Sequence, residues 1–159
     1  MNARVELEFD PGEAPLPVGT PDEVRLRGWI EAALGDHPGG TVSIRLVDEA
    51  ESAALNQQWR QRSGATNVLS FPAAPLPGID PAPLGDLALC SSVIAREAVE
   101  QGKTAEAHWA HMVVHGVLHL IGYDHQDATE ADTMESHERA ILARLGHPDP
   151  YPDEPATPT

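Results

Sequence analysis

The 159-residue sequence has little of three things: cysteine, positive charge and long apolar runs. Its single cysteine, Cys90, excludes an internal disulfide and fits a reducing compartment. Ten lysines and arginines against 25 acidic residues give a net charge of −15. This charge argues against a protein that coats nucleic acid without specificity and against binding to an anionic membrane surface. No run of about 18 apolar residues is present, so no membrane span is predicted, and the first residues alternate like a strand rather than forming a signal peptide.

Proline-rich stretches divide the rest of the chain. Residues 10–21 and 72–83 are predicted to be loops, because proline cannot donate to a sheet ladder. Residues 147–159 are predicted to be a disordered proline-rich tail. An apolar content of 41% is enough for one domain with a substantial core. We therefore predict a single domain over residues 1–146.

Hydrophobic periodicity and capping residues place nine elements in this domain. Four strands are expected, at residues 5–9, 41–47, 67–71 and 86–90. Five helices are expected, each between a capping residue and a stop: from a Thr20–Glu23 capping box to Leu34, from Asp48 to about Arg60, from Ser91 or Ser92 to Gly102, from Thr104 to Gly122, and from Asp127 to Gly146. This set of elements predicts a mixed α/β or α+β layer structure.

Histidines are concentrated in one of these helices. Five of the eight histidines lie between residues 108 and 125. His108, His111, His115 and His119 fall within an arc of roughly 80° on a helix that is otherwise apolar nearly all round. Burying that many imidazoles without partners would cost a few kcal/mol each, on the order of unpaired polar burial. We therefore predict a metal site, with His108 and His111 supporting or lining its cleft.

The segment HGVLHLIGYDH, residues 115–125, has the spacing of a metal site. His115 and His119 lie one helical turn apart, Gly122 can end the helix, and His125 can return from the turn as a third ligand. Three neutral imidazoles leave a fourth coordination position open, as in catalytic rather than structural zinc sites. By affinity alone such a site also admits nickel or cobalt.

The glutamate that usually accompanies this spacing is missing. Metzincin proteases carry a glutamate directly after the first histidine as general base, and this sequence has Gly116 there. Peptide hydrolysis needs proton transfer to and from the reacting groups, so proteolysis is disfavoured. A phosphodiester would instead be attracted to the cation itself. Arg60 could bind a second phosphate oxygen, although its position alone favours a solvated helix end.

Three segments resemble the YbeY family of single-strand-specific, metal-dependent endoribonucleases. HGVLHLIGYDH resembles the family's signature, LNQQWRQRSGATNVLSFP (residues 55–72) its arginine-bearing helix and following strand, and LGDLALC (residues 84–90) its next strand. The resemblance implies one Zn²⁺ ion bound by His115, His119 and His125, with Arg60 as the functional arginine facing the metal. It also implies an α+β fold, in which a small mixed four-stranded sheet is covered by about five helices, with a zincin-like metal helix at the centre.

The same resemblance implies a function in the cytoplasm. It points to cleavage of single-stranded RNA in rRNA maturation and ribosome quality control, with ribosomal components as partners and without DNA or a membrane. Two alternatives remain open: a metzincin-like metalloprotease, and a non-enzymatic ribosome assembly factor whose metal only tightens the fold. The sequence identifies no general base, and the nucleophile is either water or the 2′-OH of the substrate.

Overall fold

The computed structural model describes residues 4–12, 16–74, 78–79, 82–123 and 127–151. Strands and helices alternate at first, and three helices end the order: β1, α1, β2, α2, β3, β4, α3, α4, α5. The strands are β1 (Arg4–Asp10), β2 (Gly39–Val47), β3 (Val68–Pro72) and β4 (Pro83–Cys90). The helices are α1 (Glu23–Leu34), α2 (Glu49–Arg60), α3 (Ser91–Glu100), α4 (Ala105–Leu120) and α5 (Ala128–Arg144).

The strands form one mixed sheet in the order β1-β2-β4-β3. β1 and β4 both run parallel to β2, and β3 runs antiparallel to β4 at one edge. Parallel neighbours need a crossover, and here the crossovers contain helices. Within the described residues, four strands and five helices therefore confirm the predicted α+β fold.

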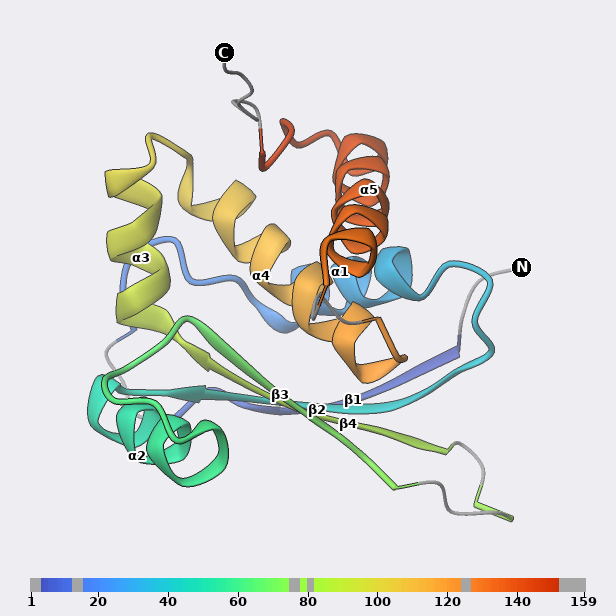
Figure 1. Cartoon of the computed structure of the whole chain (residues 1–159), viewed down its shortest axis with the longest axis horizontal. Helices are drawn as coiled ribbons and strands as arrows, with labels where there is room; N and C mark the ends of the chain where they lie inside the picture. Colours follow the sequence, from blue (N-terminus) through green and yellow to red (C-terminus); the bar gives the residue numbers. More distant parts are fainter. Residues whose placement is uncertain (1–3, 13–15, 75–77, 80–81, 124–126, 152–159) are drawn as a thin grey trace.

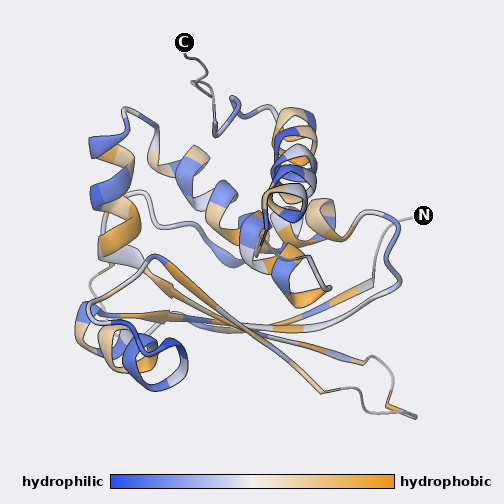
Figure 2. Ribbon diagram, in the orientation of Figure 1, coloured by the Kyte–Doolittle hydropathy of each residue, from blue (hydrophilic) through white to orange (hydrophobic). Residues whose placement is uncertain are grey.

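Helices cover the two faces of the sheet unequally. In Figure 1, α1, α3, α4 and α5 lie on one face, whereas α2 lies on the opposite face near one end. α4 is central to the larger layer, since it packs against α1, α3 and α5 as well as β3 and β4. Figure 2 shows α2 as largely hydrophilic. On the sheet face that α2 covers, the strands and α2 together line a hollow.

The core is built around α4. Every residue from Ala107 to Leu120 is buried except His115 and His119, which keep partial exposure. Trp109 and Leu118 are among the fully buried side chains of the core. A helix that is apolar nearly all round has to be enclosed, which confirms the predicted central helix. None of the helices in the described part of the chain is both long and apolar enough to cross a membrane.

The ends of α4 follow the sequence signals. The hydroxyl of Thr104 accepts a hydrogen bond from the backbone N–H of Ala107 at 3.1 Å and so caps the helix start. Past the helix end, Gly122 has a φ of +109°, a conformation that favours glycine. The helix therefore stops where the histidine motif requires the chain to turn.

Two capping predictions are wrong. α1 is capped by Asp22, whose carboxylate accepts from the N–H of Arg25 at 3.0 Å, while the hydroxyl of Thr20 donates to the carbonyl of Pro17. Aspartate caps as well as threonine does and lies nearer the helix. α3 has no side-chain cap, because β4 runs directly into it and Cys90 occupies both the strand end and the N-cap.

Candidate metal centre and its cleft

Two histidines of α4, His115 and His119, are partly exposed to solvent. His115 and His119 lie one helical turn apart, and their ring centroids are 4.8 Å apart. Side chains spaced by four residues share one face of a helix. Because the residues around them are buried, these two rings are the polar groups that α4 presents at this opening.

A buried carboxylate on α5 contacts the first of these histidines. Glu138 has no exposed surface, and its Oε2 lies 2.6 Å from Nδ1 of His115. An ionised carboxylate only accepts hydrogen bonds, so the neutral form of this ring would carry its proton on Nδ1 and keep a lone pair on Nε2. Metal-binding histidines are commonly held in this way by a carboxylate on their other nitrogen.

The second oxygen of Glu138 has two partners. Nε2 of His111 lies 2.9 Å from Oε1, and the hydroxyl of Tyr151 donates to the same atom at 2.5 Å. Burial alone would raise the pKa of Glu138, but the hydrogen bonds from His111, His115 and Tyr151 outweigh it and lower the pKa to about 2. Burial and the adjacent carboxylate raise the pKa of Tyr151, so its phenol remains a donor. The carboxylate is therefore ionised at neutral pH.

His111, His115 and Glu138 could hold a metal ion, because each offers one ligand atom and these atoms lie within 4.8 Å of one another. Imidazole nitrogen and carboxylate oxygen are suitable ligands for a divalent cation such as zinc. This group shares His115 with the predicted set. His119 lies beside it, and His125 lies outside the described residues, so the three-histidine site stays a prediction.

Arg60 lies along the same cleft as these histidines. A cavity of about 210 Å³ has Arg60, His115 and His119 in its walls. α2 and α4 lie on opposite faces of the sheet, and they meet at this cavity around the edge strand β3. Arg62, Thr66 and Ser70 line it as well. The structure thus brings Arg60 and two predicted ligands together, while the role of Arg60 in catalysis stays a prediction.

Local hydrogen bonds hold Arg60 at the end of its helix. α2 ends there because the next residue adopts a left-handed φ of 56°. The loop that follows is bonded back to α2 by two buried side chains: Asn56 donates to the carbonyl of Gly64 at 2.9 Å, and Ser52 donates to the carbonyl of Thr66 at 3.0 Å. The loop therefore returns along α2 before entering β3.

Sequence reasoning missed Glu138 and Tyr151. Glu138 follows Met134 by four residues and precedes Ile141 by three, so it is a charged residue on the buried face of α5. A carboxylate at such a position is rarely buried without a partner, and that signal could have found it. Tyr151 carries no comparable signal, because it lies in a proline-rich segment. His108 has a different partner from His111: its Nε2 lies 2.8 Å from a carboxylate oxygen of Glu97.

The fold and the cleft together define an α+β protein with a candidate metal centre on its central helix and an arginine in the wall of the same cavity. The chain belongs to the YbeY family, since the sequence model of that family, described as "Endoribonuclease YbeY", matches residues 23–146. The matched range includes the histidine helix and α2. The resemblance seen in three sequence segments is thereby confirmed.

Relatives agree with this assignment over most of their length. An "Endoribonuclease YbeY" from Pseudomonas putida is 56% identical over 150 residues, which cover 93% of this chain and 95% of that protein. One from Pseudomonas syringae pv. syringae is 56% identical over 136 residues, covering 84% and 82%. The solution structure of TM1509 from Thermotoga maritima aligns with a TM-score of 0.53 at 22% identity, covering 89% of this chain and 92% of that one, and shows a shared fold.

Proposed function

We propose that the protein is a zinc-dependent endoribonuclease that cuts single-stranded RNA in the cytoplasm, in rRNA maturation and ribosome quality control. The observation that carries the proposal is the single cavity lined by Arg60, His115 and His119. Membership of a family whose relatives are named endoribonucleases supplies the reaction class. The single cysteine is buried and unpaired, in keeping with a reducing compartment.

One Zn²⁺ ion held by His115, His119 and His125 is the cofactor of this proposal. The support is the tautomer of His115, because its bond to Glu138 leaves Nε2 with a lone pair. A zinc ion in such a site supplies positive charge that polarises a phosphate and activates water. Neutral imidazole ligands leave that charge undiminished, which suits an anionic substrate better than a peptide.

The charge distribution limits where RNA can bind. The chain as a whole is strongly acidic, so attraction to phosphate has to come from local cations. Arg60 and Arg62 both line the metal cleft, and a guanidinium can bind a phosphate through two parallel hydrogen bonds. The cavity is smaller than a typical ligand pocket of roughly 300–1,000 Å³. It therefore fits one phosphodiester of a single strand, and ribosomal components would supply any wider contact.

Cleavage of a defined single-stranded RNA tests the proposal. We expect His119→Ala to lose zinc and activity, and Arg60→Ala to keep zinc and its melting temperature while cleaving about 100-fold more slowly. Arg144→Ala is the matched control, because Arg144 is also an exposed arginine that ends a helix. If His119→Ala and Arg60→Ala both fold and support ribosome maturation like wild type although they no longer cleave, catalysis is not the function and the non-enzymatic assembly factor is the better explanation.

The product ends identify the nucleophile. If water attacks the phosphorus, the products carry a linear phosphate and a hydroxyl, and no cyclic intermediate is released. If the 2′-OH of the substrate attacks, the 5′ fragment ends in a 2′,3′-cyclic phosphate. We expect linear ends, measured by mass spectrometry of the fragments at early time points. A cyclic end would contradict attack by water but would leave the endoribonuclease assignment intact.

A further inference from the structure

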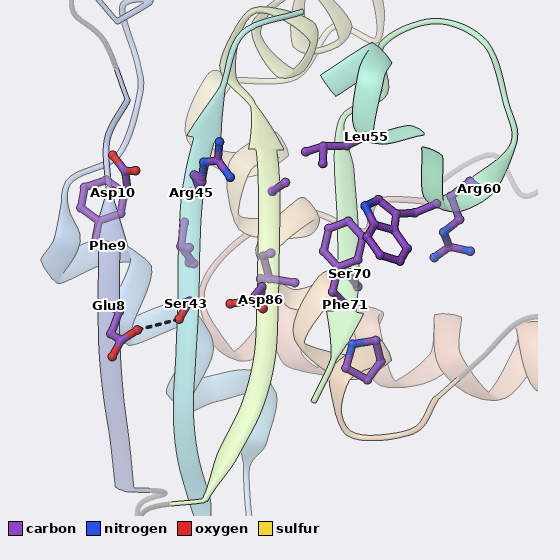
Figure 3. A pocket seen from close by; sticks show the side chains of 15 residues that line it. Glu8, Phe9, Asp10, Ser43, Arg45, Leu55, Arg60, Ser70, Phe71 and Asp86 are labelled. Atoms are coloured by element: carbon purple, nitrogen blue, oxygen red, sulfur yellow. Dashed lines mark hydrogen bonds between the residues drawn. The ribbon is translucent and has the colours of Figure 1, made fainter. Parts of the chain in front are cut away.

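A second cavity lies on the outer face of the sheet, next to the metal cleft. It has a volume of about 980 Å³, and its walls come from β1, β2, β3, β4 and α2. Figure 3 shows its side chains projecting from the strands, with Leu55 and Arg60 of α2 on one side. The proposed cleavage chemistry uses none of this face except Arg60. The hollow is therefore a candidate for a separate binding step.

Aromatic rings form the wall of the hollow nearest to Arg60. Trp59 and Phe71 have ring centroids 6.0 Å apart and an angle of 72° between their planes. The side chain of Trp59 is 59% exposed, whereas Trp29 and Trp109 are 5% and 1% exposed. An exposed indole beside a second ring offers a surface on which a planar base can stack.

Arg60 and Ser70 connect this hollow to the metal cleft. Both residues line both cavities. Ser70 belongs to β3, the edge strand, and its hydroxyl lies 3.3 Å from the carbonyl of Gly116 on the histidine helix. A chain whose phosphate is bound by Arg60 can therefore place one neighbouring nucleotide towards His115 and the other towards Trp59.

Carboxylates occupy the far side of the hollow. Figure 3 shows Glu8 and Asp10 on β1, on the opposite side from Phe71 and Arg60. Arg45 of β2 also lines the hollow, but it is paired with Glu51. The carboxylates of β1 therefore repel phosphate and keep an RNA backbone at the Arg60 side. Asp86 pairs with Phe71 across the β3–β4 register, so both side chains emerge on the same face of the sheet and line the hollow. A carboxylate there can accept a hydrogen bond from the amino group of a base.

We propose that the aromatic side of this hollow, formed by Trp59 and Phe71, binds an unpaired base of the RNA chain whose phosphate lies at Arg60. Asp86 adds a preference for bases that carry an amino group. This subsite rests on the proposed RNA substrate, and it would hold the strand on one side of the cleaved phosphodiester. Stacking needs a base that is not paired, so the subsite favours single strands over duplexes.

Fluorescence of the full-length, zinc-loaded protein tests the subsite directly. Because Trp59 is the exposed tryptophan, quenching by acrylamide reports mainly on it. We expect a 2′-O-methyl adenosine hexanucleotide to shield Trp59, and an abasic hexanucleotide of the same charge to shield it far less. Trp59→Leu should bind the adenosine hexamer about tenfold more weakly, by anisotropy of an end-labelled strand. The affinity of Trp59→Phe for the hexamer should stay close to that of wild type. The affinity of Val99→Ala, a change at another exposed apolar residue, should be the same as that of wild type.

The preference for the base is tested with a uridine hexamer. We expect wild type to bind adenosine and cytidine hexamers more tightly than uridine, and Asp86→Ala to reduce that difference. Unchanged binding by Trp59→Leu, or equal shielding by the abasic strand, would overturn the subsite. So would shielding of Trp59 by oligolysine and not by the hexamers, since the hollow would then suit a basic protein segment.

The outcomes separate this inference from the proposed function. If His119→Ala and Arg60→Ala abolish cleavage while Trp59→Leu binds and cleaves like wild type, the endoribonuclease stands and the subsite fails. If those two variants cleave normally while Trp59→Leu loses affinity for the hexamer, the base-binding site stands and the proposed catalytic site fails.

Discussion

Replacing Glu138 with alanine is expected to destabilise the metal-free protein by about 3–5 kcal/mol and to weaken zinc binding by about 10- to 100-fold. Glu138 is fully buried and accepts hydrogen bonds from His111, His115 and Tyr151. Without it, the ring N–H groups of His111 and His115 lose their carboxylate acceptor, and the tautomer of His115 is no longer fixed. Urea unfolding in chelator measures the first effect, and competition with a zinc indicator measures the second.

Controls on the same helix and in the same network sharpen this result. Asp132→Ala removes an exposed carboxylate of α5 and should change stability by less than about 0.5 kcal/mol. Tyr151→Phe removes one of the three hydrogen bonds to Glu138 and should cost about 1.5–3 kcal/mol, less than Glu138→Ala. If Glu138→Ala unfolds and binds zinc like wild type, the carboxylate does not support the metal centre.

The pH dependence of stability gives an independent readout. The pKa of Glu138 is lowered to about 2 in the folded protein, so the unfolded chain binds this proton first as the pH falls. The stability contributed by the carboxylate is therefore complete above the unfolded pKa of about 4.3 and is lost as the pH falls towards 2. The difference in stability between wild type and Glu138→Gln should shrink across that window in metal-free protein.

The fold was accessible from the sequence because its signals are local. Asp48, Thr104 and Asp127 cap helices through their own side chains, and β1 and most of β2 alternate with period two. The order β1-β2-β4-β3 depends on long-range packing, and no local signal carries it. The predicted cap of α1 was wrong because two suitable capping residues, Thr20 and Asp22, stand two positions apart. Only the surrounding turn decides between them.

The site was accessible only in part, for the same reason. The spacing of His115 and His119 is local, since one helical turn sets it. Glu138 lies on another helix, and its contact with His115 exists only once α4 and α5 pack together. Arg60 shows most clearly how far local sequence signals reach. Its position in the sequence resembles a solvated helix end, and only the path of the chain around β3 places it in the cleft.

Substituting Gly116 with glutamate is expected to cost more than about 3 kcal/mol of stability and to produce no peptidase activity. The substitution restores the residue that metzincins carry after their first histidine. In this structure, however, a Cβ at position 116 would lie 2.8 Å from Cδ2 of Leu87 and 3.3 Å from Cγ2 of Val68. The position therefore faces the sheet, and a carboxylate would be forced among apolar side chains instead of reaching the cleft.

Two alanine substitutions isolate the effect of space from that of helix propensity. Gly28→Ala, in α1, meets nothing within 4 Å and should stabilise the protein by roughly 0.5–1 kcal/mol. Gly116→Ala gains the same propensity but presses on Leu87, and overpacking of about 1–3 kcal/mol makes it neutral or destabilising. Chemical denaturation of the three variants measures these differences. The close approach of α4 to the sheet is what excludes a general base at position 116. A folded Gly116→Glu protein that cleaves an unstructured peptide in a zinc-dependent way would therefore contradict this account and restore the protease alternative.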